Sequence, residues 1–330
     1  MGARGVYGWM HGAEHHRGGV GFFRIAEPLR VFDQLAPTFH GTDITYDVLD
    51  QCDTIVVHNP TDIDRSLTWS DLARAQTHRL ILDVDDAMWC PDFQGFRDYY
   101  RPEVLERLYA NVRLAHVVTT PSAVIADHLS QYNPNVWVVP NTVPAWLLDH
   151  RPIRPVRPTV GFQGSDSHVH DWRRQEQQRL GRFLQEHPDW DLHTYGGFGS
   201  HLFGKSPRVH YTPWASSTED YWRNVSLTVG VGPLRDTPFN RAKSALRAVE
   251  YMALGIVPVL PHLRPYWGVY TDGVEGKFIH PHQTMYTVLR GLARDGLGVI
   301  AEMAERGRQL ARLYTTEANL ERIAAAWMSV

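Results

Sequence analysis

The chain has 330 residues, 43% of them hydrophobic and 21% charged, a composition close to that of globular proteins that excludes a largely disordered chain or a bundle of membrane helices. One ordinary domain spans roughly 100 to 200 residues, so this length predicts two domains, each large enough to bury a core. The formal net charge of -3 excludes an overall cationic field that would attract nucleic acid.

Cysteine content and hydropathy indicate the compartment. The chain contains two cysteines, Cys52 and Cys90, and they lack the spacing of a zinc site or of a disulfide framework. No apolar run is long enough to span a bilayer, and the segment from Met1 to Met10 lacks the apolar core of a signal peptide. We therefore expect a cytoplasmic protein without transmembrane contact.

A glycine-rich run precedes the first helical pattern. Between Gly18 and Ile25 the chain reads Gly-Gly-Val-Gly-Phe-Phe-Arg-Ile, which places Gly19 and Arg24 in or just after a flexible loop. Most glycine loops only turn the chain. On these residues alone, a turn and a ligand-binding loop both remain open.

Short β-branched runs recur through the first half, with helical patterns between them, which is typical of βαβ units and a parallel sheet. The polar His58 ends one of these runs, and a lone histidine is more often structural than functional. The predicted strands are 53–58, 80–84, 115–120 and 136–139, and the clearest predicted helices are 102–114 and 121–131.

Three carboxylates end the predicted strand 80–84 and follow it: Asp83, Asp85 and Asp86. Carboxylates this close together repel one another unless something offsets their charge. One interpretation is a metal site, in which Asp-x-Asp bridges a divalent ion to a diphosphate. Another is capping of the next helix by Asp85 or Asp86.

Five aromatic residues lie in the segment 88–100, beginning with Trp89. Sugars and nucleobases stack on such rings, so the segment is a candidate acceptor platform. Aromatic residues in a loop also form small satellite cores beneath it. Both interpretations remain open at this point.

A proline-rich segment at 149–158, with arginines at 151, 154 and 157, separates two sets of strand and helix patterns. Its three prolines favour extended backbone, so it is the best candidate for an interdomain linker. Strand and helix patterns resume directly after it. The predicted strands are 158–163, 191–195, 208–212, 226–231 and 256–260, and the predicted helices are 173–186, 217–224, 240–254 and 284–312.

The predicted helix 240–254 has the best-marked boundaries in the chain. Asn240 is placed to cap its start, and Gly255 followed by Pro258 is placed to close it. At 100° per residue, Lys243, Arg247 and Glu250 share one narrow stripe. A helix start carrying a lysine is an anion site, and Glu250 lies about 10 Å further along, about the span from diphosphate to ribose diol. A solvated stripe of charge pairs is the competing interpretation.

This segment resembles a known family. The string FNRAKSALRAVEYMALGIVPVL, residues 239–260, resembles the donor-site segment of GT-B glycosyltransferases of the family 4 type. Glu250 matches the family's ribose-binding glutamate, and Ala253, Gly255, Pro258 and Val259 hold the spacing of its pattern. The family often carries another glutamate eight residues earlier, where this chain has Ala242.

Weaker similarity extends over nearly the whole chain. Residues 139–141 resemble the strand end before the interdomain crossover, and residues 161–165, which include Gly164 and Ser165, resemble the first strand and glycine turn of the donor domain. Residues 272–278 resemble a late donor-domain hairpin. Residues 315–327 resemble the terminal helix that crosses back to the first domain.

The resemblance implies a GT-B fold: two Rossmann-like α/β domains facing a central cleft. It implies an acceptor-binding domain at 1–148, a linker at 149–158, a nucleotide-sugar-binding domain at 159–314, and a terminal helix at 315–330 that packs on the first domain.

The resemblance also implies roles for individual residues. Glu250 would bind ribose, and Lys243 would stabilise the diphosphate leaving group with Arg247 in support. Backbone amides near Gly164, Ser165 and Asn240 would approach phosphate. In a subgroup with Asp-x-Asp-Asp, Asp85 or Asp86 would bind or polarise the acceptor hydroxyl. The expected acceptor contacts are Gly19, Arg24, His58 and Trp89.

The expected activity is transfer of a sugar from a UDP-, GDP- or dTDP-sugar to a hydroxyl group. By resemblance it is retaining and metal-independent, with no cofactor beyond the donor. The acceptor class stays open among a glycan, a protein and a hydroxymethylated DNA base, and the last would give the arginines at 151, 154 and 157 a role. A sugar-nucleotide epimerase or phosphorylase of the same fold is an alternative. A non-catalytic nucleotide-sugar-binding module, suggested by Ala242, is another.

Overall fold

A computed structural model describes residues 5–11, 19–92, 94–150, 153–164, 166–196, 203–204 and 206–328. By compactness the chain divides into two units. The first comprises residues 1–144, 237–244 and 315–330, and the second comprises 145–236 and 245–314. The segment predicted as a linker, 149–158, falls within the second unit, and its residues 151 and 152 lie outside the described residues.

The first unit is built on a six-stranded sheet in the order β2-β1-β3-β4-β5-β6, and every neighbouring pair is parallel. Its four later strands confirm the predicted runs. The two at the start escaped prediction because β1 carries two glycines and β2, with the sequence Thr-Phe-His-Gly, contains one apolar residue. The strands are β1 (Gly5–Trp9), β2 (Thr38–Gly41), β3 (Cys52–His58), β4 (Arg79–Asp83), β5 (Val117–Thr120) and β6 (Val136–Val138).

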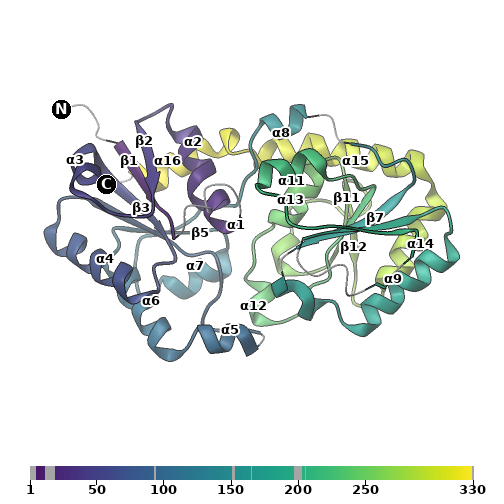
Figure 1. The fold of residues 1–330 in the computed structure, drawn as a ribbon, viewed down its shortest axis with the longest axis horizontal. Helices are drawn as coiled ribbons and strands as arrows, with labels where there is room; N and C mark the ends of the chain where they lie inside the picture. Colours follow the sequence, from purple (N-terminus) through teal and green to yellow (C-terminus); the bar gives the residue numbers. More distant parts are fainter. Residues whose placement is uncertain are drawn as a thin grey trace. The chain divides into compact units, whose positions relative to one another are not determined.

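Alternating side chains build a core on each face of this sheet, because successive residues of a strand point to opposite faces. In β3, Ile55 and Val57 belong to one core cluster and Val56 to the other. Figure 1 shows α4 and α6 along one face, while α2 and α16 lie at the other. The helices of the first face are α3 (Tyr46–Gln51), α4 (Ile63–Ala75), α6 (Pro102–Leu114) and α7 (Ala123–Leu129), and those of the second are α2 (Glu27–Phe32) and α16 (Leu320–Met328).

The expected terminal helix is confirmed as α16, which packs on α2 in the first unit. Ile323, Ala326 and Trp327 enter the core beneath β3 and β4, and the Trp327 ring lies 5.2 Å from that of Phe32. Just before it, the Thr142 hydroxyl hydrogen-bonds the Thr316 hydroxyl at 2.9 Å. Apolar packing and this polar contact together fix the end of the chain to the first unit.

The second unit has its own six-stranded parallel sheet, in the order β12-β11-β10-β7-β8-β9. All five predicted strands are present, and β12 is an addition of three residues in the segment that resembles a hairpin; it pairs in parallel with β11. The strands are β7 (Thr159–Gly164), β8 (Asp191–Gly196), β9 (Val209–Thr212), β10 (Val229–Val231), β11 (Val257–Pro261) and β12 (Lys277–Ile279).

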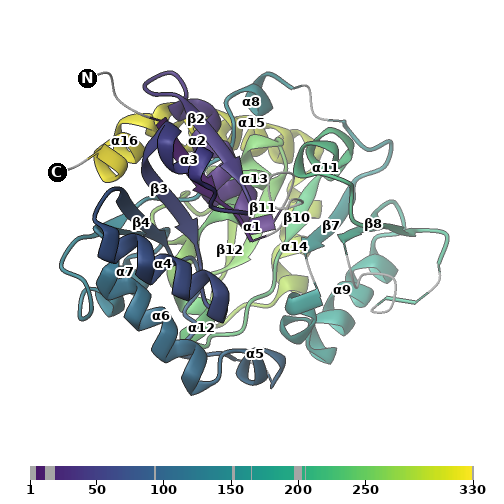
Figure 2. The same cartoon turned by 60° about the vertical axis from the view of Figure 1, so that its left-hand side comes forward.

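Two predicted helices are each broken in two. The predicted helix 284–312 divides at Gly296, whose φ of 90° interrupts the helical backbone. Figure 2 shows the resulting α14 beside the second sheet. The helices of the second unit are α8 (Trp146–Asp149), α9 (Arg174–Glu186), α11 (Thr218–Asn224), α13 (Leu246–Ala253), α14 (Met285–Asp295) and α15 (Leu297–Ala311).

The predicted helix 240–254 is the second correction. It consists of α12 (Pro238–Arg241), which belongs to the first unit, and α13, which belongs to the second. The prediction of Asn240 as the cap is wrong, because the Thr237 side chain caps α12 by accepting from the Asn240 backbone N–H. Lys243 follows α12 and shares no helix with Arg247 and Glu250. Gly255, with φ 67°, follows the end of α13 as predicted.

Close packing places α13 on the second sheet. A Cβ at Gly230 in β10 would come within 2.6 Å of the Tyr251 ring, so only glycine lets this ring lie directly on the strand. The Tyr251 hydroxyl donates a hydrogen bond of 3.0 Å to the Val231 carbonyl oxygen. Because α13 carries Glu250, this contact also sets the height of Glu250 above the sheet.

In the described part of the chain, no helix is long and apolar enough to cross a bilayer.

We predict that Gly230→Ala destabilises the protein by about 1–3 kcal/mol, because the added methyl group displaces the Tyr251 ring. The matched control is Gly291→Ala in α14, where an added Cβ meets nothing within 4 Å. Helix propensity alone should make that variant up to about 1 kcal/mol more stable. Equal stabilities of the two variants in chemical denaturation would contradict the packing described here.

Candidate functional site

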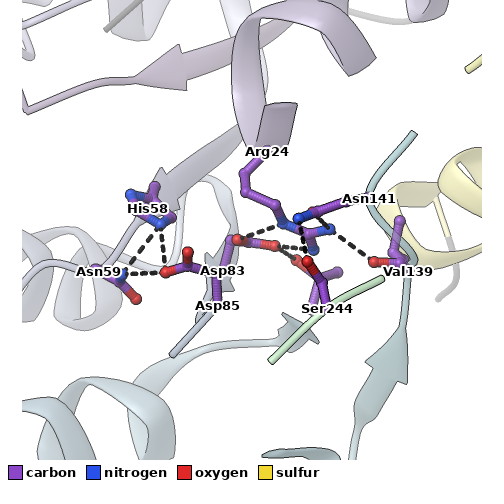
Figure 3. Close-up of polar contacts among 9 residues, drawn as sticks. Arg24, His58, Asn59, Asp83, Asp85, Val139, Asn141 and Ser244 are labelled. Carbon is purple, nitrogen blue, oxygen red and sulfur yellow. Dashed lines mark hydrogen bonds and ion pairs between the residues drawn. The ribbon is translucent and has the colours of Figure 1, made fainter. Parts of the chain in front are cut away.

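Polar side chains gather where the parallel strands of the first sheet end, and Figure 3 shows this edge. Asp83 ends β4 with 1% of its surface exposed. Arg24 donates to both of its oxygens, from Nε to Oδ1 at 2.9 Å and from Nη2 to Oδ2 at 2.6 Å. The Thr119 hydroxyl donates to the same Oδ2 at 2.5 Å. Asp83 is therefore an internal anchor, held by three hydrogen bonds.

Arg24 lies in η2 (Phe22–Ala26), a π-helical turn, and is 4% exposed. Besides Asp83, its Nη1 donates to the Val139 carbonyl oxygen at 2.7 Å and to Asn141 Oδ1 at 2.9 Å. Four N–H groups of Arg24 thus donate hydrogen bonds to other groups of the protein. These contacts give Arg24 an internal role, which differs from the acceptor contact expected from the sequence.

His58, at the end of β3, meets the second carboxylate of the loop. Its Nε2 lies 2.9 Å from Asp85 Oδ1, and the Asn59 amide donates to the same oxygen at 2.7 Å (Figure 3). Asn59 reaches it from a backbone with φ 41°, a conformation uncommon outside glycine. The two strand ends are therefore tied together by one charged cluster.

Electrostatics make His58 and Asp85 an ion pair. Burial alone would lower the pKa of His58, but the charge and hydrogen bond of Asp85, with Asp83, raise the pKa above its usual value. Burial likewise opposes ionisation of Asp85, and His58 together with the Asn59 amide lowers the Asp85 pKa below its usual value. Imidazolium and carboxylate stabilise one another here.

Asp86 behaves in the opposite way. Burial and the neighbouring Asp85 charge raise the pKa of Asp86 to about 7, although Lys243 and His58 partly offset them. Lys243 lies in the same unit, in the segment 237–244, and its Nζ is 5.2 Å from the centre of the Phe239 ring. Asp86 therefore changes charge near neutral pH, which suits a group that exchanges a proton.

The segment that carries Lys243 is fixed to the first unit. Phe239 and Ala242 belong to its core cluster. The Asn141 amide donates to Ser244 Oγ at 2.9 Å, and Thr237 Oγ1 donates to Asp92 Oδ2 at 3.2 Å. Asn240, 1% exposed, is buried within this attachment.

Packing explains most of the aromatic segment 88–100. The Trp89 ring stacks on His128 with centroids 3.7 Å apart, and Phe96 lies 5.4 Å from Phe239. Trp89 and Phe96 pack against the core of the first unit. For these two rings the satellite-core interpretation is the one that the contacts support.

Glu250 is the central charged group of the second unit. It is 4% exposed, and each of its oxygens accepts a hydrogen bond, Oε1 from Trp222 Nε1 at 2.9 Å and Oε2 from Gln163 Nε2 at 3.0 Å. Burial raises the pKa of Glu250 to about 7, although these bonds and the Arg247 charge oppose the rise. The carboxylate is thus held rigidly in one orientation.

Arg247, one turn before Glu250, fixes the end of β7. Its Nη1 donates to the Gln163 carbonyl oxygen, its Nη2 lies 3.1 Å from His168 Nε2, and its guanidinium lies 4.6 Å from the centre of the Phe162 ring. This explains why Gln163 is well placed to meet Glu250. Arg247 and Glu250 form one network at the carboxyl end of β7, as ligand sites of parallel sheets do.

The remaining predicted contacts are glycines and one serine. A Cβ on Gly164 would meet the Phe162 ring at 2.7 Å, so the chain passes this ring closely at the end of β7. Gly19 opens α1 (Gly19–Gly21) with φ 65°, and nothing lies within 4 Å of a Cβ placed there. Ser165 and Gly18 lie outside the described residues.

Sequence reasoning missed several partners of the site. Asn59 and Gln163 stand at strand ends, where polar residues of parallel sheets gather, and that position was the available signal. Asn141 entered the sequence analysis only within residues 139–141, as part of a strand end, and nothing in the sequence singles out Trp222. In the described part of the chain, no group of three or more His, Cys, Asp or Glu side chains is arranged to hold a metal ion.

Comparison with solved structures gives the fold. The structure matches sucrose-phosphate synthase from Thermosynechococcus elongatus with a TM-score of 0.69 and 12% identity, over 99% of this chain and 98% of that one. It matches HepE from Anabaena, solved with UDP-glucose, with a TM-score of 0.68 and 13% identity, over 99% and 100%. The chain has the GT-B fold. The fold class predicted from the sequence is thereby confirmed.

A third similar GT-B structure is TarM from S. aureus, with a TM-score of 0.57 and 12% identity. That match covers 84% of this chain and 55% of TarM. No family model and no curated protein matches the sequence.

Removing Arg24 should destabilise the first unit strongly. We predict that Arg24→Ala lowers the free energy of unfolding by about 3–5 kcal/mol, because it leaves the buried Asp83 charge unpaired. Arg74→Ala is the matched control, since Arg74 pairs with Asp71 at 2.7 Å while both side chains are about three-quarters exposed, and it should change stability by less than about 1 kcal/mol. Urea denaturation compares the two, and equal effects would refute the anchoring role of Arg24.

Proposed function

We propose that this protein is a glycosyltransferase that moves a sugar from a nucleoside diphosphate sugar to a hydroxyl acceptor. The observation that carries the proposal is Glu250. Its carboxylate is buried and oriented in a GT-B fold similar to that of HepE, which was solved with UDP-glucose and with UDP and glucose. It stands where the segment 239–260 resembles the ribose-binding glutamate of family 4 enzymes.

The hydrogen bonds of Glu250 leave room for a ribose diol. A carboxylate offers about four lone-pair sites, and Gln163 and Trp222 occupy one on each oxygen. One further hydroxyl per oxygen completes the set. Because Gln163 and Trp222 already fix the Glu250 carboxylate, ligand binding would cost this side chain no further conformational freedom. This suits a rigid contact with a ligand.

The residue types indicate which groups would contact the donor's diphosphate. Lys243 is a compact cation that would stabilise charge developing on the leaving diphosphate. Arg247 has a supporting role, because its guanidinium already bonds the Gln163 carbonyl oxygen and faces His168. Backbone amides near Gly164 would contribute N–H donors. A UDP-, GDP- or dTDP-sugar would be the only cofactor, and metal independence and retention of configuration stay predictions from the resemblance.

The acceptor would bind at the carboxyl edge of the first sheet, beside Asp85 and Asp86. A sugar or protein hydroxyl suits this polar edge. Of the arginines that would favour DNA, Arg157 is paired with Asp191 at 3.0 Å, which weakens the case for a nucleic-acid acceptor.

The test is a thermal-shift screen with UDP-, GDP-, dTDP- and ADP-sugars and with CMP-sugars. We expect one class to raise the melting temperature by several degrees, and Glu250→Ala to abolish that shift. Glu250→Gln keeps the buried shape and should weaken the shift without loss of folding. The exposed Glu302, which pairs only with Arg306 at 3.5 Å among the described ion pairs, supplies the control Glu302→Ala with an unchanged shift. A protein that no nucleotide sugar stabilises would refute the proposal.

A further inference from the structure

A cavity of about 380 Å³ lies at the amino-terminal edge of the second sheet. Pro158, Thr228 and Gly255 border it there, just before β7, β10 and β11 begin. The Glu250 network stands at the carboxyl end of β7, so the cavity is a separate feature at the opposite edge of the same sheet. Its volume falls within the range of small-molecule sites, roughly 300–1,000 Å³.

A single face of α15, the long helix labelled in Figure 1, forms one wall of this cavity. The lining residues of α15 and of the turn η5 (Arg312–Tyr314) have the spacing of one helical stripe. At 1.5 Å per residue the stripe is about 20 Å long. Its first half is apolar and its second half is polar, so the wall has an apolar end and a charged end. In chain order the stripe consists of Leu297, Ile300, Ala301, Ala304, Glu305, Arg308, Gln309 and Arg312.

The segment before β7 supplies further apolar side chains to the cavity. Ile153, Pro155 and Val156 line it. The Val156 side chain is fully exposed, and those of Ile153 and Leu297 are 47% and 54% exposed. Apolar surface left in water costs free energy, which is recovered when an apolar ligand covers it. This part of the cavity therefore suits a hydrocarbon chain.

Positive charge dominates the polar part of the lining. The charged residues there are Arg154, Arg308, Arg312 and Glu305. The Arg308 guanidinium donates to the backbone carbonyl oxygens of Leu148 and His150, which uses two of its five N–H groups and fixes its position. Among the described residues, neither Arg154 nor Arg308 pairs with a carboxylate. Because a guanidinium binds phosphate or carboxylate through two parallel hydrogen bonds, these charges suit an anionic group.

From this pairing of apolar and cationic surface we infer that the cavity binds a single-chain anionic amphiphile, a molecule with one hydrocarbon chain and a phosphate or carboxylate head. The chain lies between the segment 153–156 and the apolar start of α15, and the head meets Arg308, with Arg154 and Arg312 adding positive charge. The volume is at the small end of the range for ligand sites, which favours one chain over two. The inference does not rest on the proposed function, because the cavity shares no lining residue with the Glu250 network.

The first test is calorimetric titration of the full chain with octyl phosphate below its critical micelle concentration. Octanol has the same chain without the charge, and inorganic phosphate has the charge without the chain. We expect one octyl phosphate to bind per chain, at least about tenfold more tightly than either of these, because both chain burial and charged hydrogen bonds contribute. Octanol or inorganic phosphate binding as tightly as octyl phosphate would overturn the inference.

The second test locates the site with substitutions at two exposed positions of the lining. Arg154→Gln removes a cation, and Ala301→Trp places a ring in the apolar part of the cavity. We expect each to weaken binding of octyl phosphate by at least about fivefold and to leave urea unfolding unchanged. The matched control is Arg306→Gln, since Arg306 lies on α15 outside the lining and pairs with Glu302 at 3.5 Å; its affinity should not change. Binding that neither Arg154→Gln nor Ala301→Trp weakens places the ligand elsewhere and refutes the assignment.

A bilayer surface is the competing partner, because exposed apolar and cationic residues also attract anionic membranes. Sedimentation with phosphatidylglycerol vesicles distinguishes it from a ligand in the cavity. We expect octyl phosphate to bind without vesicles, and Ala301→Trp, which fills the cavity and keeps its charges, to lose that binding. A protein that sediments with the vesicles but does not bind octyl phosphate has a membrane-docking surface in place of a ligand cavity, and this outcome overturns the inference.

Discussion

The buried ion pair between Arg24 and Asp83 determines how the first unit presents its polar groups. It joins η2, the end of β4 and the chain after β6, and Asn141 extends it to Ser244. Two charges withdrawn from water are stable only when each is paired and hydrogen-bonded, and here four donated bonds of Arg24 and three accepted by Asp83 meet that condition. With Asp83 anchored, the loop that follows has a fixed course, and Asp85 and Asp86 acquire different partners.

The different ionisation of Asp85 and Asp86 follows from the same anchoring of Asp83. Asp85 is kept ionised by His58 and Asn59, and its fixed negative charge is one reason that the next carboxyl group resists ionisation. Adjacent residues of one type thus have opposite pKa shifts. In the second unit, burial raises the pKa of Glu250 in a comparable way, but two donors hold that carboxylate. The Glu250 carboxylate is thereby fixed in one orientation by Gln163 and Trp222.

The sequence was informative wherever periodicity and turn residues act locally. The β-branched runs predicted nine strands correctly. Gly255 predicted the end of a helix, and the spacing from Glu250 to Val259 carried the resemblance that predicted the GT-B fold. The break between α12 and α13 was not foreseeable from helix periodicity, because Phe239 and Ala242 are drawn into the core of the first unit. The inward turn of Arg24 was missed for a similar reason, since its partner Asp83 lies 59 residues away and such pairing leaves no local pattern.

The proposed glycosyl transfer depends most directly on Glu250 holding the donor's ribose. Calorimetric titration of UDP and of its 2′,3′-dideoxy analogue, into the wild type and into Glu250→Gln, measures that contact itself. We expect removal of the two hydroxyls to weaken binding to the wild type by at least about tenfold, because hydrogen bonds to a charged group are lost. For Glu250→Gln we expect binding to weaken by less than about threefold. An equal loss in both proteins would show that the ribose does not meet Glu250 and would contradict the proposed role of this residue.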